Sequence, residues 1–181
     1  MALSASDRQW FLNEIVRLDP TGELVDVVNG GAQLRYSDKI RSDETRLRKA
    51  ETEELVRAVI VGLLCSPIYG YEPERMYIER TYSIGRPSAT TAQVDLILYF
   101  EEEDGSETAF AMWEMKAPDE YKPATDPLIE KQLFDTAPLV APSLLVYASV
   151  RPQNSSVECV TVDYTAHKSY ASWDSAGRPS T

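Results

Sequence analysis

The chain has 181 residues, a formal net charge of −11, one histidine and two cysteines. This length suits a single domain that buries its core without disulfides. The negative charge disfavours a broad basic surface for nucleic acid, because neutralisation of phosphates supplies most of the affinity of such surfaces. The one histidine, His167, lies in a polar stretch near the C-terminus. Catalytic sites built on histidine are therefore disfavoured too.

The cysteines and the absence of long apolar runs indicate the cellular setting. Cys65 and Cys159 lie in apolar surroundings and lack the spacing of a metal site, which is typical of a reducing compartment. No apolar run approaches the 18 residues of a membrane span, and "MALSASDRQW" lacks the features of a signal peptide. We expect a soluble, cytoplasmic protein without zinc and without a membrane partner.

The N-terminal part of the chain predicts two helices with a hairpin between them. Apolar residues recur at helical spacing over residues 7–18, which predicts a short amphipathic helix. Asn29-Gly30 inside "ELVDVVNGGAQLRY" supplies the positive φ angles of a tight hairpin turn. Residues 43–64 contain no glycine or proline before Gly62 and place their apolar side chains on one stripe. This segment predicts a long helix.

The rest of the chain predicts mainly strands. Alternating apolar patterns favour strands over residues 76–84, 91–100, 107–116, 143–150 and 157–164, with a helix over 126–140. This order of elements predicts an α/β fold in which helices flank a mixed central sheet. We expect one domain over residues 1–165, with a core over about 43–164, followed by a frayed polar tail or linker over 166–181.

Two of the predicted strands bring acidic residues together. Asp104-Gly105 lies midway between strands 91–100 and 107–116, and this dipeptide is a strong hairpin signal. With these two residues as the turn, the numbers of paired residues add up to 209 (104 + 105), so Asp95 lies opposite Glu114. Their β-carbons would then be about 5 Å apart. Two carboxylates on one face of a sheet repel each other unless a cation lies between them.

The segment "AFAMWEMKAPDE" adds a lysine to this pair. Side chains alternate along a strand, so Glu114 and Lys116 point to the same face. Mg²⁺ prefers oxygen ligands and retains several waters, which suits two carboxylates beside phosphate oxygens. The lysine would add a fixed positive charge near a phosphate or an attacking water. This combination predicts metal-dependent hydrolysis of a phosphodiester.

A third carboxylate is expected from the predicted long helix. Glu53 shares the stripe of Val56 and Ile60, and Arg57, one turn later, could pair with it. Glu54 is the competing candidate, because the sequence does not specify the rotation of the helix. Both Glu53 and Arg57 could equally form an ordinary surface pair.

These residues together resemble the PD-(D/E)xK nuclease superfamily. The chain is most similar to the N-terminal nuclease domain of type I restriction enzyme R subunits, which implies a restriction-endonuclease-like fold. The matching segments follow one another between about residues 50 and 150: "TEELVRAVIVGLL", "GYEPERMYIER", "QVDLILYF", "AMWEMKAPDE", "IEKQLFDTA" and "SLLVYASV".

In that family the helix glutamate, the strand aspartate and the E-x-K pair bind Mg²⁺ and cut DNA. The resemblance implies the active-site residues Asp95, Glu114, Lys116 and Glu53 (or Glu54), with Asp95, Glu114 and Glu53 as metal ligands. It also implies Gln132 as a supporting glutamine, although a position on the polar side of its helix explains this residue equally well. Family members often carry a tyrosine four residues after this glutamine, where this chain has Thr136.

Basic residues before the predicted long helix suggest a surface for DNA. Arg46, Arg48 and Lys49 lie close in sequence to Glu53 and are candidate phosphate contacts; a charged helix start held by salt bridges is the alternative.

The sequence predicts an Mg²⁺-dependent DNA endonuclease domain of a restriction or phage-defence system, in which Mn²⁺ substitutes for Mg²⁺. Its expected partners are DNA and other restriction-system subunits or domains, because the chain has no phosphate loop of a motor ATPase. The alternative is a catalytically silent module of the same fold that binds nucleic acid or docks a partner subunit.

Overall fold

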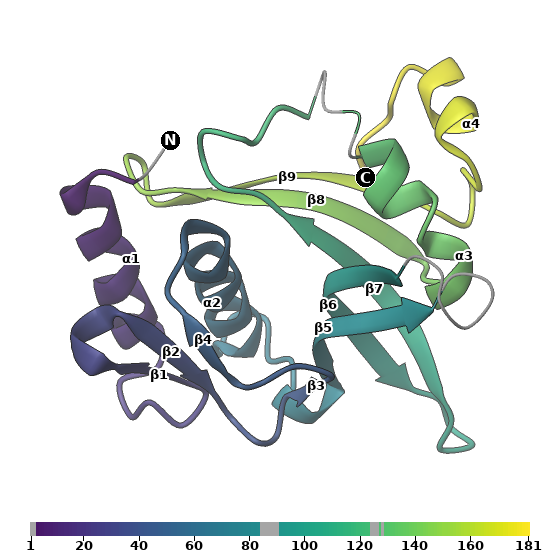
Figure 1. Ribbon diagram of the computed structural model, residues 1–181. Coiled ribbons are helices and arrows are strands. Elements are labelled where there is room, and N and C mark those ends of the chain that lie inside the picture. Colours follow the sequence, from purple (N-terminus) through teal and green to yellow (C-terminus); the bar gives the residue numbers. More distant parts are fainter. Residues whose placement is uncertain (1–2, 84–90, 124–126, 128) are drawn as a thin grey trace.

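The computed structural model describes residues 3–83, 91–123, 127 and 129–181 (Figure 1). Over these residues the strands form a six-stranded sheet in the order β3-β5-β6-β7-β8-β9, the main sheet, and a three-stranded sheet in the order β1-β2-β4, the small sheet. Helices lie against the main sheet, so the predicted α/β fold with a mixed central sheet is confirmed. The last residue of one predicted strand, Ile84, and the first residue of the predicted helix 126–140, Asp126, lie outside the described residues.

The N-terminal helix and hairpin are present as predicted, with small shifts at their ends. Helix α1 (Ala5–Leu18) begins after Ser4, whose hydroxyl accepts a hydrogen bond from the Asp7 N–H. Strands β1 (Val25–Val28) and β2 (Gln33–Tyr36) are antiparallel, and a 3₁₀ turn, η1 (Asn29–Gly31), joins them with positive φ angles at all three of its residues. The turn is longer than two residues because η1 and the residue after it separate the paired ends of the strands.

The predicted helix over 43–64 is wrong in its first half. Residues 47–49 form strand β4 (Leu47–Lys49), which pairs antiparallel with β2, and helix α2 (Thr52–Cys65) begins only after Glu51. Local helix propensity over "DETRLRKA" is overridden by this pairing, which satisfies the backbone groups of a half-exposed strand. Helix α2 itself is buried along almost its whole length.

The main sheet combines antiparallel and parallel pairs. Strand β3 (Arg41–Ser42) is parallel to β5 (Met76–Ser83), and β7 (Glu107–Met115) is parallel to β8 (Leu144–Arg151). The other neighbours are antiparallel; they involve β6 (Thr91–Glu101) and β9 (Ser156–Asp163). The connection between the parallel strands β7 and β8 contains the segments that cover one face of the sheet, as parallel crossovers require.

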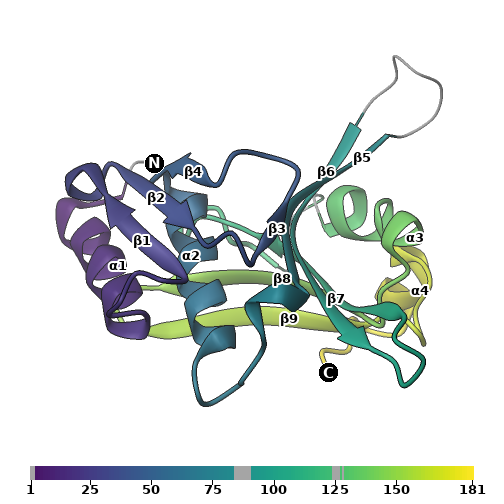
Figure 2. The same ribbon diagram turned by 90° about the horizontal axis from the view of Figure 1, so that it is seen from below.

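Alternating side chains give the main sheet two apolar faces. In β6, Leu96 and Leu98 pack in a core shared with α1, α2 and the small sheet, whereas Ile97 and Tyr99 pack in a second core under the C-terminal helices. Figure 2 shows α1, α2 and the small sheet on one side of strands β5 to β7, and α3 and α4 on the other. Successive side chains of β6 therefore point alternately into the first and the second core, which explains the alternation in the sequence.

The C-terminal part of the fold departs from the prediction in two places. The predicted helix over 126–140 is divided into a π-helical segment, η3 (Ile129–Phe134), and a short helix, α3 (Ala137–Val140). Pro138 explains the division, because proline lacks an N–H and its ring clashes with the preceding turn of a continuous helix.

No helix within the described residues is long and apolar enough to cross a membrane.

The prediction of a frayed tail or linker over 166–181 is wrong. Helix α4 (Tyr170–Ser175) begins after Ser169, and its Trp173 is almost completely buried in the second core beside Phe134. The chain end also pairs with the sheet, since the Thr181 N–H donates to the Thr161 carbonyl. Composition misled here because a single buried tryptophan is enough to hold a short polar segment on the domain.

Candidate active site

The predicted pairing of Asp95 with Glu114 depends on the register of β6 and β7. The observed pairs Leu96↔Trp113 and Leu98↔Ala111 have the register expected from the sequence, so Asp95 and Glu114 occupy the next positions along the two strands. The turn itself differs, because the Glu102 N–H donates to the Ser106 carbonyl and leaves three residues in the loop.

A β-bulge compensates for this longer turn. Beyond Leu98 the partner shifts by one, so Tyr99 pairs with Ala109 and Phe110 is the extra residue on β7. A bulge of this kind puts two residues of one strand opposite one residue of its partner. The register at the site is therefore as predicted, although the turn is not.

Asp95 is held by two donors from different elements. Its Oδ1 accepts a hydrogen bond from Arg57 Nη2 at 2.7 Å, and its Oδ2 accepts one from the Met115 N–H, also at 2.7 Å. The carboxylate thus joins α2 to the end of β7. Each of its oxygens retains a lone pair, because a carboxylate oxygen accepts two hydrogen bonds or a hydrogen bond and a metal.

Glu114 and Lys116 share a face and form a buried ion pair. Lys116 Nζ lies 2.6 Å from Glu114 Oε1, and the two side chains are 9% and 7% exposed. Burial, reinforced by the negative charge of Asp95 and opposed by Lys116, raises the pKa of Glu114 to about 8. Burial alone would lower the pKa of Lys116, but the charge and hydrogen bond of Glu114 outweigh it and raise that pKa. The pair therefore holds its protons to a higher pH than the separate side chains would.

Helix α2 presents its two adjacent glutamates to different surroundings. Glu53 lies beside Asp95, Glu114 and Lys116, with its Oε1 3.6 Å from Lys116 Nζ. Burial raises the pKa of Glu53, against the opposing charge of Lys116. Glu54 instead accepts a hydrogen bond from the Tyr36 hydroxyl at 2.6 Å and pairs with Arg57 at 2.7 Å. Of the two candidates, Glu53 is the one that lies next to Lys116.

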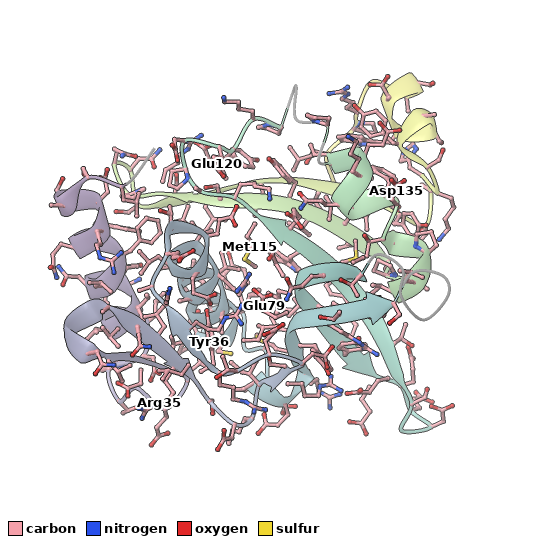
Figure 3. All side chains as sticks on the ribbon, viewed as in Figure 1. Arg35, Tyr36, Glu79, Met115, Glu120 and Asp135 are labelled. Carbon is pink, nitrogen blue, oxygen red and sulfur yellow. The ribbon has the colours of Figure 1, made fainter. Side chains whose placement is uncertain are left out.

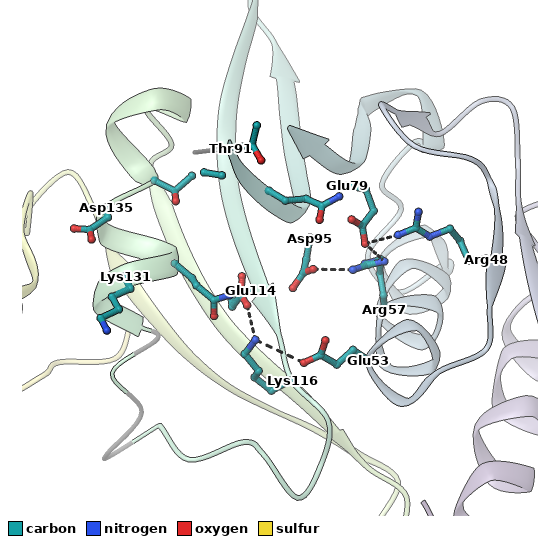
Figure 4. A pocket seen from close by; sticks show the side chains of 14 residues that line it. Arg48, Glu53, Arg57, Glu79, Thr91, Asp95, Glu114, Lys116, Lys131 and Asp135 are labelled. Atoms are coloured by element: carbon teal, nitrogen blue, oxygen red, sulfur yellow. Dashed lines mark hydrogen bonds and ion pairs between the residues drawn. The ribbon is translucent and has the colours of Figure 1, made fainter. Parts of the chain in front are cut away.

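Arg57 does not form the pair with Glu53 that the sequence suggested. Its Nη1 lies 2.7 Å from Glu54. The same atom lies 2.5 Å from Glu79, and Nη2 binds Asp95 (Figure 4). Glu79 is not among the residues predicted from the sequence. The available signal was the pair of charged residues Glu79-Arg80 inside an otherwise alternating strand, which breaks the period of two.

A cavity of about 540 Å³ connects these groups with η3 (Figure 4). Gln132 and Lys131 from η3 line it opposite Glu114, as do Asp135 and Thr136, which follow η3. The Gln132 Oε1 is buried and has no hydrogen-bond partner among the described residues. Single π-helical turns are frequent at functional sites. The cavity brings together the five candidate active-site residues Asp95, Glu114, Lys116, Glu53 and Gln132.

The three proposed DNA contacts have different surroundings. Arg48 lines the cavity, but its guanidinium is bound to Glu79 at 2.9 Å and is 19% exposed. Arg46 lies outside the cavity lining and donates to the Ile40 carbonyl. Lys49 is exposed at the end of β4 and lines a second, neighbouring pocket. Only Arg48 therefore touches the site itself, and it does so as part of the buried ion network.

The donor set suits a hard divalent cation. Asp95, Glu114 and Glu53 offer carboxylate oxygens and Gln132 an unpaired amide oxygen, which are the ligands that Mg²⁺ prefers. Within the part of the chain that the structure describes, no three His, Cys, Asp or Glu side chains are arranged as a ready metal site. Lys116 and Arg57 meanwhile provide the positive charge that Glu114 and Asp95 need. The residues fit the ion chemically, because a carboxylate oxygen that accepts a hydrogen bond, as Glu114 Oε1 does from Lys116, keeps a lone pair for a metal.

Comparison with models of known protein families finds no match for this chain, and comparison with curated proteins finds no relative of significant similarity.

Proposed function

We propose that this protein is a metal-dependent endonuclease domain that hydrolyses phosphodiester bonds of DNA. The observation that carries the proposal is the shared cavity, in which Asp95 and Glu114 from neighbouring strands lie beside the Lys116 ammonium group. Carboxylates that bind a divalent cation next to a fixed positive charge are suited to phosphoryl chemistry, where most of the catalysis is electrostatic. The restriction or phage-defence setting and further restriction-system subunits as partners rest on the sequence resemblance, and the cytoplasmic location rests on the cysteine usage and the lack of long apolar runs.

The metal, when bound, supplies a water of lowered pKa and neutralises charge on the phosphate. In this proposal Asp95 and Glu114 hold Mg²⁺ or Mn²⁺, with Glu53 as an additional ligand from α2. Glu114 would bind it as the carboxylate. The ammonium group of Lys116, which also lines the cavity, would stabilise negative charge on the phosphate oxygens. The Gln132 amide would orient the water or the phosphate from the opposite wall.

The charges of the cavity favour DNA only when a metal is present. Its lining carries five carboxylates against the four cationic side chains of Arg48, Arg57, Lys116 and Lys131. A divalent cation reverses the sign of this balance, so a phosphate is attracted to the metal-loaded site and repelled from the empty one. Affinity for DNA that depends on the metal is therefore part of the proposal.

One observation favours a second candidate, a catalytically silent module of the same fold that binds nucleic acid or docks a partner subunit. Asp95 and Glu114 already have counter-ions, Arg57 and Lys116, so their proximity by itself does not require a metal. A protein that had lost activity could keep this arrangement as an internal ion network.

Cleavage of supercoiled plasmid distinguishes the two candidates. The purified protein is incubated with Mg²⁺ or Mn²⁺ in parallel with Asp95→Asn and Lys116→Gln, and with Glu103→Gln at the exposed hairpin tip as the matched control. We expect nicking by the wild type and the control, and a loss of about 100-fold or more in the two site variants. Equal nicking by all four proteins would contradict catalysis at this site. A wild type that neither nicks nor binds Mn²⁺ in calorimetry would favour the silent module.

A further inference from the structure

Arg57 is the most deeply buried cation of the network that also contains Arg48 and Lys116. It is 4% exposed and lies on α2, and it binds carboxylates from three elements: Glu54 on α2 itself, Glu79 on β5 and Asp95 on β6. The guanidinium is planar and holds its donors in a rigid fork, which fixes the relative directions of the groups it binds. Arg57 thus ties the helix to two strands of the main sheet in one geometry.

The anchor of Arg57 on β5 is kept at a conformational cost. Glu79 has a φ of +53° within a strand, between the regular pairs Ile78↔Leu96 and Arg80↔Val94. A non-glycine residue in this region is strained, and such residues cluster at functional sites. At this position the Glu79 carboxylate contacts both Arg57 and Arg48. Figure 3 labels Glu79 and Tyr36, which approach α2 from different strands.

Of the three partners of Arg57, Asp95 is the predicted metal ligand that lines the cavity; Glu54, the competing candidate for the helix carboxylate, does not line it. Arg57 occupies one of the Asp95 oxygens, and the Met115 N–H occupies the other. With both oxygens held, rotation of the carboxylate about its terminal bond is suppressed. The free lone pairs of the Asp95 oxygens are then presented in one direction.

From these contacts we infer that Arg57 is a positioning residue: anchored by Glu79 and Glu54, it fixes the Asp95 carboxylate in the orientation that receives the metal. The inference rests on the proposed function of Asp95. Arg57 acts through Asp95 and not on the substrate. Residues that orient the ligands of a metal are a general requirement of such sites, and their loss typically lowers metal affinity by about 10- to 100-fold.

The alternative is that Arg57 is a structural ion pair with no effect on the site. Arg57→Lys separates the two readings because it keeps the charge but replaces the fork by one ammonium group. Tyr36→Phe is the matched control: it also removes a buried polar contact of this network, the one to Glu54, but touches neither Arg57 nor Asp95. Both variants are expected to lose stability, so the readout must be specific to Asp95.

Amide hydrogen exchange at Met115 gives such a readout without any metal. Its N–H donates to Asp95 Oδ2, so a carboxylate that is no longer held exposes this amide. In Arg57→Lys we expect exchange at Met115 to accelerate about tenfold or more relative to the other β7 amides, as in Asp95→Asn. Tyr36→Phe should change all β7 amides alike. Unchanged relative exchange in Arg57→Lys, or equal acceleration in Tyr36→Phe, would overturn the inference.

Titration with Mn²⁺ by calorimetry provides the second arm. Arg57→Lys should bind Mn²⁺ about 10- to 100-fold more weakly than the wild type, and should cause no further loss in an Asp95→Asn background. Equal or tighter binding by Arg57→Lys would contradict positioning, because it would mean that Arg57 merely competes with the metal for Asp95. If Arg57→Lys does not fold, Glu79→Gln, which removes the anchor but keeps Arg57, replaces it in both arms. A wild type that does not bind Mn²⁺ through Asp95 contradicts the proposed function alone, and the exchange arm still decides the role of Arg57.

Discussion

The two ends of the β6–β7 hairpin carry the same kinds of residue in opposite surroundings. At the tip, Glu101 to Asp104 and Glu107 are exposed, and Ser106 lowers the pKa of Asp104 by hydrogen bonding. At the base, Glu114 is buried beside Asp95, and burial raises its pKa to about 8. Acidic composition therefore says little about function. What distinguishes the base is the removal of water and the few partners that replace it.

The largest expected difference between the two ends is the loss of stability when the cation that pairs with a glutamate is replaced, Lys116 at the base or Arg75 near the tip. Lys116→Met leaves the buried Glu114 carboxyl without its hydrogen-bond partner and should destabilise the protein by about 1–3 kcal/mol in urea unfolding. Arg75 pairs with Glu101 near the tip, where solvent screens the charges, so Arg75→Met should not change stability measurably. Similar losses in the two variants would show that the base is not the low-dielectric region described here.

The rate of DNA cleavage should depend on the glutamate at the base of the hairpin and not on those at its tip. Under the proposed function, Glu114→Gln should lower the rate of DNA cleavage about 100-fold or more, because it removes a charged metal ligand and leaves a neutral amide. Glu102→Gln at the tip should cleave at the wild-type rate. Comparable rates in Glu114→Gln and the wild type would exclude Glu114 from catalysis.

The pKa of Glu114 at the base is raised and that of Asp104 at the tip is lowered, so their contributions to stability change with pH in opposite directions. The pKa of Glu114 is raised in the folded protein, so its contribution to stability is complete below its unfolded pKa and is lost as the pH rises toward about 8. Glu114→Gln should therefore gain stability relative to the wild type between about pH 5 and 8, by at most about 1.4 kcal/mol per pH unit.

Asp104 provides the control for this titration. Its pKa is lowered, so its contribution is present above its unfolded pKa and is lost only as the pH falls below it. The difference between Asp104→Asn and the wild type should stay constant over pH 5 to 8 in unfolding experiments. A slope in Asp104→Asn, or none in Glu114→Gln, would contradict the assigned surroundings.

The smallest effect is expected from the backbone at the tip. Gly105 has a φ of +79°, which a side chain disfavours, although a β-carbon there would meet open space. Gly105→Ala should cost about 1 kcal/mol through this conformation alone. Chemical denaturation would measure it, and a neutral effect would mean that the turn adapts to another conformation.

Sequence reasoning located the strands and the residues of the cavity, but not the partners of those residues. Alternation over β6 and β7 and the Asp-Gly signal were sufficient to bring Asp95 next to Glu114, even though the bulge at Phe110 and the three-residue turn were not foreseen. The spacing of Glu114 and Lys116 was sufficient to put both on one face. These features are local, so their periodicity appears in the sequence.

The prediction failed where distant segments meet. Strand β4 replaced half of a predicted helix because β2 offered it a partner, and α4 is ordered because Trp173 reaches Phe134. Glu79 was missed because neither its positive φ nor its contact with Arg57 leaves a local pattern. Such contacts are decided by packing, which overrides weak local preferences.

The sequence by itself determined the mixed α/β fold, the pairing of β6 with β7 and the shared face of Glu114 and Lys116, because side-chain alternation and turn chemistry act over a few residues. Only the tertiary structure decided that Glu53 rather than Glu54 lies beside Lys116, and that Arg57 binds Asp95. The physical reason is that helix rotation, burial and the choice of counter-ions depend on which distant segments exclude water together.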